Sequence, residues 1–205
     1  MNLNNSDITG IVLAGGQSRR MGFNKAEAEM NGESMLIRMI HKMKAVTSTI
    51  LVSSGAVTYT NISLPQIPDE FPQCGPLGGI YSVLKTTNTS LNLIVSCDIP
   101  LVSVSLLKYV LKRAVESDSL ITIPIDHDGH LQTMCAVYRK GILPFLKQQI
   151  DARELKMKRL LDLVSVEYVK ITREHPLYNE HAFLNVNSPN NLEEARKLWK
   201  HQKEE

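Results

Sequence analysis

Residues 13–25 read Leu-Ala-Gly-Gly-Gln-Ser-Arg-Arg-Met-Gly-Phe-Asn-Lys, and they continue an apolar run from Ile8 that is typical of a buried β-strand. Gly15 and Gly16 carry no Cβ, so their backbone can bend sharply and approach a ligand closely. Successive N–H groups in such a turn can form a nest for an anion. Three cations belong to the same stretch, at Arg19, Arg20 and Lys25. The spacing matches neither GxxxxGK[ST] nor GxGxxG. It predicts a phosphate-binding loop at a strand end, and the alternative is a flexible glycine-rich turn with solvated basic residues.

Outward from this loop, apolar runs of strand length alternate with segments of helical periodicity. Strands are expected at 8–14, 49–53, 64–67, 92–96, 120–125, 134–139, 166–171 and 183–186. Helices are expected at 34–43, with Ser34 as N-cap, at 75–85, 103–116, 141–150 and 155–163, and from Ser188-Pro189 onward. This order predicts an α/β fold in which a mostly parallel central sheet has helices on both faces. The pair 120–125 and 134–139 predicts a small antiparallel insertion, and no linker divides residues 1–205, so we expect a single domain.

The composition excludes several classes of protein. The chain has 205 residues, 43% of them hydrophobic, and a formal net charge of +2. Such a chain can bury a core, has no apolar run long enough to span a bilayer, and lacks the basic excess of a sequence-blind nucleic-acid binder. The first residues do not resemble a signal peptide, and the three cysteines lie far apart without a CxxC motif. We therefore expect a cytoplasmic protein with no nucleic-acid or membrane partner.

Two groups of polar side chains follow expected strands. Asp98 follows the apolar run 92–96 and precedes Pro100. This position places it at the carboxyl edge of a parallel sheet, beside the loop that begins at Gly15. A carboxylate facing bound phosphates there is a natural Mg²⁺ ligand, and the alternative is an Asp that caps a helix or forms an Asx-turn. Asn185 and Asn187 alternate along the last short strand, so we expect both side chains on one face. They are candidates for contact with a second substrate or for hydrogen bonds to nearby backbone.

Four motifs together make the chain recognisable. Residues 13–25 resemble the LAGGxSxRMGxxK signature of nucleotidyltransferases with a Rossmann-like core, and the chain is similar to the molybdenum cofactor guanylyltransferases within that superfamily. Residues 75–80 (GPLGGI), 96–100 (SCDIP) and 185–189 (NVNSP) resemble the GPLAGI, CDxP and NVNTP segments of the family, in the family's order. Three positions depart from the pattern: Asn24 stands where an acid is usual, Ser53 where some members have Asn, and Gly78 where Ala is usual.

The resemblance implies a three-layer nucleotidyltransferase fold and a set of site residues. Nucleotide binding is expected at Leu13, Ala14, Gly15, Gly16, Lys25, Asp69, Gly78 and Asp98. The expected catalytic residues are Lys25, Arg20 and Asp98, with Asp98 as the Mg²⁺ ligand. Asn185 and Asn187 are the candidate second-substrate residues, and Gln132 and Thr133 lie where the family receives its pterin. For Asp69 a polar turn, and for Gly78 and Gly79 tight helix packing, are the alternative interpretations.

The implied reaction is transfer of GMP from GTP to the phosphate of molybdenum-bearing molybdopterin. GTP and the pterin are then the small-molecule partners, and molybdoenzymes or cofactor carriers are candidate protein partners. A phosphate monoester is already a competent nucleophile, so catalysis would consist of positioning and charge neutralisation. The alternatives are a cytidylyltransferase or sugar-phosphate nucleotidyltransferase of the same superfamily, and a non-catalytic nucleotide- or cofactor-binding module.

Overall fold

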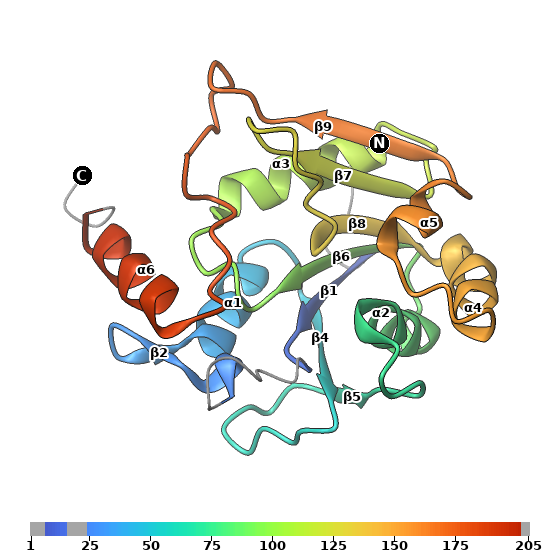
Figure 1. Ribbon diagram of the computed structural model, residues 1–205, viewed down its shortest axis with the longest axis horizontal. Coiled ribbons are helices and arrows are strands. Elements are labelled where there is room, and N and C mark those ends of the chain that lie inside the picture. Colours follow the sequence, from blue (N-terminus) through green and yellow to red (C-terminus); the bar gives the residue numbers. More distant parts are fainter. Residues whose placement is uncertain (1–6, 16–23, 202–205) are drawn as a thin grey trace.

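The computed structural model describes residues 7–15 and 24–201. In these residues a seven-stranded sheet with the strand order β5-β4-β1-β6-β8-β7-β9 forms the centre of the molecule (Figure 1). The strands are β1 (Ile8–Leu13), β4 (Thr49–Gly55), β5 (Gln66–Pro68), β6 (Leu91–Ser96), β7 (Ile121–Ile125), β8 (Cys135–Arg139) and β9 (Val166–Lys170). The helices are α1 (Met35–Lys44), α2 (Gly75–Thr86), α3 (Val104–Val115), α4 (Leu143–Asp151), α5 (Met157–Leu161) and α6 (Pro189–His201).

Strand directions confirm the predicted fold class and place its antiparallel element. The pairs β5–β4, β4–β1, β1–β6 and β7–β9 are parallel. Among the described strands of this sheet, β8 alone runs the other way, antiparallel to both β6 and β7. The predicted hairpin-like pair is therefore part of the central sheet. A separate small hairpin, β2 (Glu29–Met30) and β3 (Glu33–Ser34), was not expected.

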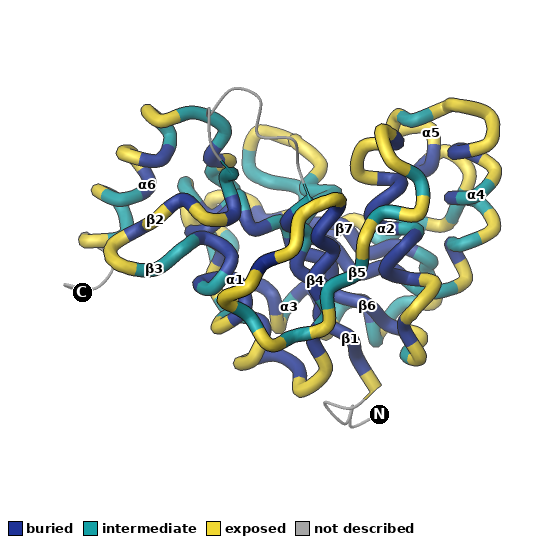
Figure 2. Tube along the Cα trace, turned by 90° about the horizontal axis from the view of Figure 1, so that it is seen from below, coloured by how far each residue is buried: buried dark blue, intermediate teal, exposed yellow. Residues whose placement is uncertain are grey.

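Two apolar layers pack on opposite faces of the sheet because successive side chains of a strand point to opposite sides. Val12 belongs to the core under α1 and α3, whereas its neighbour Ile11 belongs to the core under α2, α4 and α5. Val95 and Ile94 of β6 divide in the same way. Figure 2 shows the two groups of helices on either side of the strands. This is the three-layer arrangement that the sequence predicts.

A third apolar cluster lies beside the sheet, where α6 covers the β2–β3 hairpin (Figure 1). Its fully buried members are Ala28, Met30, Met35, Leu101, Val186, Leu192 and Ala195. Arg196 of α6 adds hydrogen bonds to the carbonyl of Glu29. The cluster joins three distant parts of the chain, residues 28–35, 101 and 186–195, each of which follows or precedes a motif named above.

Most predicted elements are present, with two differences. The segment 183–186 is not a strand: it leaves a turn closed by the bond from Leu184 N to the His181 carbonyl, and Val186 N donates to the Asp98 carbonyl. The helix expected at 141–150 is divided into a 3₁₀ turn (Lys140–Ile142) and α4, where Pro144 at the start of α4 has no N–H to donate. In the described residues no helix combines the length and apolarity needed to cross a membrane.

Candidate functional site

The first part of the site is the carboxyl end of β1. Ala14 N donates to the Ser53 carbonyl at 2.8 Å, which ties the end of β1 to β4. The backbone of Gly15 then lies directly on that of Gly55, since a Cβ built on Gly15 would stand 2.6 Å from Gly55 N. Gly55 itself has φ +63°. Two glycines are therefore required where the two strands end. Gly16, Arg19 and Arg20 lie outside the described residues, so their predicted roles stay predictions.

The second part is a polar cluster built from three of the four motifs. Lys25 Nζ donates to Asp98 Oδ2 at 2.9 Å and to Asn187 Oδ1 at 2.6 Å. The side chains of Lys25 and Asp98 are each 16% exposed, so this ion pair is screened less than a surface pair. The carbonyl of Asp98 also accepts from Val186 N at 2.8 Å. These bonds hold the 185–189 motif against the end of β6.

Asn187 therefore joins the cluster, but Asn185 does not. Because 183–186 is irregular, the expected alternation of a strand is lost, and Asn185 is exposed. The prediction that both side chains share one face through strand geometry is wrong for this physical reason. A contact of either residue with a second substrate stays a prediction.

The third part lies at the start of α2, beyond β4 and β5. Asp69 Oδ1 is buried, and no described group forms a hydrogen bond with it. Burial raises the pKa of Asp69 above its ordinary value. A Cβ on Gly79 would lie 3.4 Å from this oxygen and 3.1 Å from Ser53 Oγ. Gly78 faces away from this pair, toward the Phe71 carbonyl, so Gly79 is the glycine that lines the space beside Asp69.

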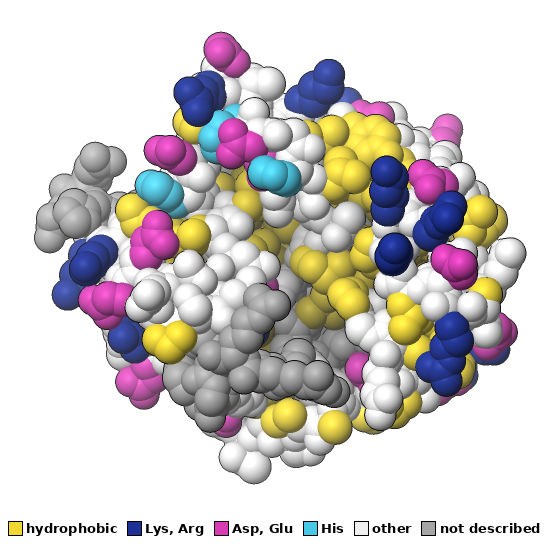
Figure 3. All heavy atoms as spheres, in the orientation of Figure 1, with side chains coloured by type: hydrophobic (Ala, Val, Ile, Leu, Met, Phe, Trp, Pro, Cys, Tyr) yellow, Lys and Arg dark blue, Asp and Glu magenta, His cyan; other side chains and the backbone are white. Residues whose placement is uncertain are grey.

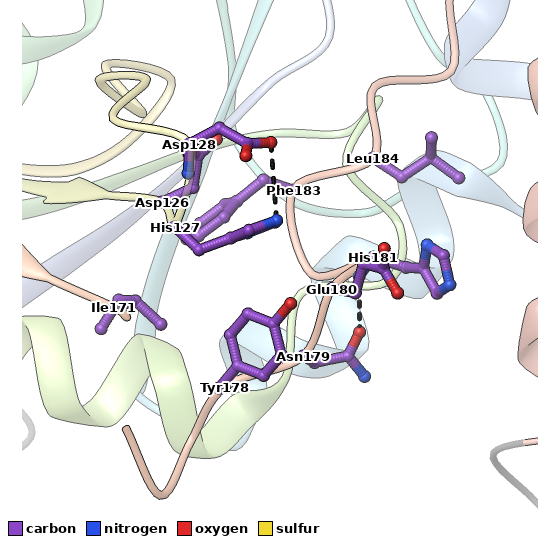
Figure 4. A pocket seen from close by; sticks show the side chains of 10 residues that line it. All are labelled: Asp126, His127, Asp128, Ile171, Tyr178, Asn179, Glu180, His181, Phe183 and Leu184. Atoms are coloured by element: carbon purple, nitrogen blue, oxygen red, sulfur yellow. Dashed lines mark hydrogen bonds and ion pairs between the residues drawn. The ribbon is translucent and has the colours of Figure 1, made fainter. Parts of the chain in front are cut away.

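A pocket of about 160 Å³ lies at the carboxyl end of β7, beside the chain that leads to Asn187 (Figure 4). Its polar walls are Asp126, His127, Asp128, Tyr178, Asn179, Glu180 and His181. The His127 ring meets the edge of the Tyr178 ring at a centroid distance of 5.3 Å. Gln132 donates to Asp126 at 2.9 Å and so adjoins this pocket, whereas the Thr133 carbonyl accepts from the Tyr138 hydroxyl. With three carboxylates in its lining, the pocket by itself is a poor place for a phosphate.

The face seen in Figure 3 is hollowed near its centre, with hydrophobic side chains along one wall and Lys and Arg side chains gathered outside that wall. In the described parts of the chain no three His, Cys, Asp or Glu side chains come close enough to hold a metal ion together. All three cysteines are buried and free. Burial raises the pKa of Cys97 and of Cys135 to about 12, so neither thiol is a ready nucleophile.

Residues 10–170 match the family model described as the MobA-like NTP transferase domain. The chain belongs to this family. It is 35% identical over 190 residues to a probable molybdenum cofactor guanylyltransferase of Pelotomaculum thermopropionicum, covering 92% of this chain and 91% of that protein. It is 33% identical over 193 residues to the molybdenum cofactor guanylyltransferase of Vibrio cholerae, covering 91% and 90%.

Among solved structures, the fold is similar to molybdopterin-guanine dinucleotide biosynthesis protein A of Archaeoglobus fulgidus. The TM-score is 0.83 at 21% identity, with 94% of this chain and 99% of that chain covered. The resemblance drawn from the motifs is thus confirmed, and the MobA-like chain is a nucleotidyltransferase enzyme of molybdenum cofactor biosynthesis.

Two residues of this site in the MobA-like chain escaped sequence reasoning. Gly55 lies two residues after the end of the second predicted strand (49–53), and its place at the same sheet edge as Gly15 was a signal that could have been used. Tyr59 contacts the ends of the loop segment, but it lies in a region without periodicity or motif, so nothing local pointed to it.

Proposed function

We propose that the enzyme transfers GMP from GTP to the terminal phosphate of molybdenum-bearing molybdopterin, forms the guanine dinucleotide cofactor and releases pyrophosphate in a Mg²⁺-dependent reaction. The observation that carries this proposal is the Lys25–Asp98–Asn187 cluster beside the Gly15–Gly55 contact, in a chain whose relatives bear the name of this activity. The cluster supplies a cation and a carboxylate at the sheet edge where open α/β sheets bind ligands.

In the proposed reaction an oxygen of the pterin phosphate attacks the α-phosphorus of GTP. A new P–O bond forms there, and the bond from the α-phosphorus to the bridging oxygen of pyrophosphate breaks. The buried, protonated thiols of Cys97 and Cys135 take no part in this step. Gly15, packed against Gly55, begins the proposed phosphate loop, and Lys25 would neutralise charge on the phosphates. Arg20 is proposed to act on the leaving pyrophosphate.

The donor set fits Mg²⁺. Asp98 offers one carboxylate at the site, and in the described residues no cluster of three His, Cys, Asp or Glu exists. Mg²⁺ commonly binds through one or two carboxylates and completes its octahedron with water and substrate phosphates. When bound, it would offset the negative charge that the phosphates carry. Asp98 is therefore the residue proposed to hold it.

The buried oxygen of Asp69 supports guanine as the base. Guanine presents two neighbouring N–H donors, on its ring nitrogen and its exocyclic amine, whereas the pairing edge of cytosine presents one donor and two acceptors. Asp69 Oδ1 is an acceptor without a hydrogen-bond partner in the described residues, and an N–H donor of guanine would satisfy it. The two acceptors of cytosine would leave it unsatisfied. Ser53 and the open face of Gly79 adjoin the same space.

The test is pyrophosphate release with molybdopterin as acceptor and GTP, CTP, ATP or UTP as donor, with and without Mg²⁺. GTP is expected to be used in preference. Exclusive use of CTP would overturn the guanylyltransferase assignment, and binding without pyrophosphate release would indicate a non-catalytic module.

Asp98→Ala is expected to lower turnover by about 10²- to 10³-fold or more, with an unchanged circular dichroism spectrum. The matched control is Asp162→Ala, at an exposed Asp outside the site. Near-normal turnover of Asp98→Ala would remove Asp98 from the proposed mechanism.

The remaining expectations stay predictions within this proposal. They are the contacts of Leu13, Gly16 and Gly78 with the nucleotide, molybdoenzymes or carriers as protein partners, a single domain over residues 1–205, and a cytoplasmic location.

A further inference from the structure

Tyr59 lies between β4 and β5, and its hydroxyl touches the chain on both sides of residues 15–23. The hydroxyl donates to the Ala14 carbonyl at 2.8 Å. The same oxygen accepts from Asn24 Nδ2 at 3.3 Å. Ala14 precedes the glycine pair of the predicted phosphate loop, and Asn24 precedes Lys25. One side chain from outside the motif thus connects its two ends.

The position of this hydroxyl is determined by rigid surroundings. The Tyr59 side chain is 1% exposed and belongs to the core cluster under α1 and α3. Its backbone is held from β5 by Gln66, whose Oε1 accepts from Tyr59 N and whose Nε2 donates to the Tyr59 carbonyl, each at 2.8 Å. Because the ring and the backbone are both held, the hydroxyl is a fixed point against which the ends of the loop are placed.

The direction of each hydrogen bond at the Tyr59 hydroxyl can be assigned. Asn24 Oδ1 accepts from Ala26 N at 3.1 Å and caps the 3₁₀ turn Lys25–Glu27, so the amide nitrogen must face Tyr59. Burial raises the pKa of Tyr59 to about 12, so the phenol keeps its one hydrogen at neutral pH. That hydrogen goes to the Ala14 carbonyl, and the phenol oxygen receives one of the two hydrogens of the Asn24 amide. Each group is satisfied once.

An Asp at position 24 would not permit this arrangement. An ionised carboxylate only accepts hydrogen bonds. It would compete with the Ala14 carbonyl for the single phenol hydrogen, and one of the two acceptors would lose its partner. The amide of Asn24 is therefore matched to the Tyr59 hydroxyl in this chain.

We infer that Tyr59 and Asn24 act as a pair of positioning residues that hold the two ends of the nucleotide loop together and thereby set the place of Lys25. The connection runs from the Tyr59 hydroxyl to Asn24, from Asn24 to the cap of the turn that carries Lys25, and from Lys25 to Asp98 and Asn187. The inference rests on the proposed function in taking a nucleotide as the ligand of this edge.

A double-mutant cycle tests the pairing. The proteins are the wild type, Tyr59→Phe, Asn24→Asp and the double variant, and the readouts are the Kd of the nucleotide that the wild type uses and the kcat and KM of transfer. Each single variant is expected to weaken nucleotide binding about tenfold, because each takes a hydrogen-bond partner away from the polar groups at the loop ends. The double variant is expected to bind no more than about threefold more weakly than either single variant, since the pair is already broken in each.

The matched control is Tyr138→Phe. The Tyr138 hydroxyl is buried and donates to a backbone carbonyl at 2.7 Å, as that of Tyr59 does, but its partner is Thr133 in the turn between β7 and β8. We expect this variant to lose stability while its nucleotide Kd stays unchanged. Two results would overturn the inference: independent effects that multiply in the double variant, or a Tyr59→Phe protein that is less stable yet binds nucleotide like the wild type. If the wild type uses CTP, the proposed base preference fails, and the Kd, kcat and KM of the double-mutant cycle are measured with CTP. If it binds none of the four nucleotides, both proposals fail.

Discussion

At the scale of single residues, Gly78 shows how a departure from the family pattern follows from local packing. The GPLAGI segment that residues 75–80 resemble has Ala at this position, in the first turn of α2. In this chain a Cβ at position 78 would stand 2.6 Å from the Phe71 carbonyl oxygen and 3.1 Å from Cys74 Cβ. The turn that precedes α2 is closed by a bond from Cys74 N to that same carbonyl. The turn that precedes α2 therefore occupies the space that the methyl group of an Ala at position 78 would need.

We expect Gly78→Ala to lower the free energy of unfolding by about 1–3 kcal/mol, because backbone rather than a flexible side chain must give way. Urea denaturation measures the loss. Gly141→Ala is the control, since its nearest neighbour is the end of the Leu120 side chain at 3.1 Å, and it is expected to cost less. Equal stability of the two variants would contradict the packing explanation.

At the scale of elements, Lys42 links α1 to the chain that follows Asp98 and to α6. Its Nζ donates to the carbonyls of Pro100 and Val102, each at 2.6 Å, and lies 5.3 Å from the centre of the Trp199 ring. Arg38 covers the same ring at 4.2 Å. Burial, and secondly the charge of Arg38, lower the pKa of Lys42 to about 8. A largely desolvated cation thus lies where α1, α6 and the chain after Asp98 meet.

This pKa predicts the pH dependence of stability. The folded pKa lies below the unfolded value of about 10.5, so between about pH 8 and 10.5 the unfolded chain holds a proton that the folded chain lacks. Below pH 8 the folded protein bears the full free-energy cost of burying the charged Lys42 ammonium. This cost falls as the pH rises from about 8 to 10.5 and the folded protein releases the proton. Between pH 8 and pH 9.5, we expect the free energy of unfolding to rise by up to about 2 kcal/mol more in the wild type than in Lys42→Met. Denaturant titrations at both pH values measure this difference, and parallel pH profiles of the two proteins would refute it.

At the scale of the whole molecule, the site is an assembly of segments that lie far apart in the chain. Ala14 follows β1, Ser53 lies near the end of the neighbouring β4, Asp98 follows β6, and Asn187 comes from the connection to α6. A ligand that touches several of these segments opposes unfolding of all of them, because it binds the folded state alone.

We therefore expect GTP with Mg²⁺ at a hundredfold excess over its Kd to stabilise the protein by about 2.7 kcal/mol, which corresponds to a rise in Tm of about 5–10 °C for a chain of this size. Scanning calorimetry measures the shift. Lys25→Ala is expected to lose most of it, whereas Lys158→Ala, at an exposed Lys of α5, should keep it. A full shift in Lys25→Ala would show that the nucleotide binds elsewhere.

The elements were predictable where local signals are strong. Ser34 and Ser103 accept hydrogen bonds from the third residue of α1 and α3, as N-caps do, and Ile11 and Val12 alternate between the two cores. The β2–β3 hairpin had no comparable signal, because strands of two residues are too short to show a period. The strand expected at 183–186 is absent because Leu184 N bonds to the His181 carbonyl in a turn and Val186 N bonds to the Asp98 carbonyl in a loop.

The sequence by itself determined the α/β alternation, the bounds of most elements and the motifs that define the family, because periodicity, capping and turn chemistry act between near neighbours. The tertiary structure decided that β8 runs antiparallel inside the central sheet, that Asn187 and not Asn185 joins Lys25 and Asp98, and that Tyr59 meets Ala14 and Asn24. These contacts join residues 73, 162 and 45 positions apart. Which distant side chains meet depends on how the layers pack, and no local pattern carries that information.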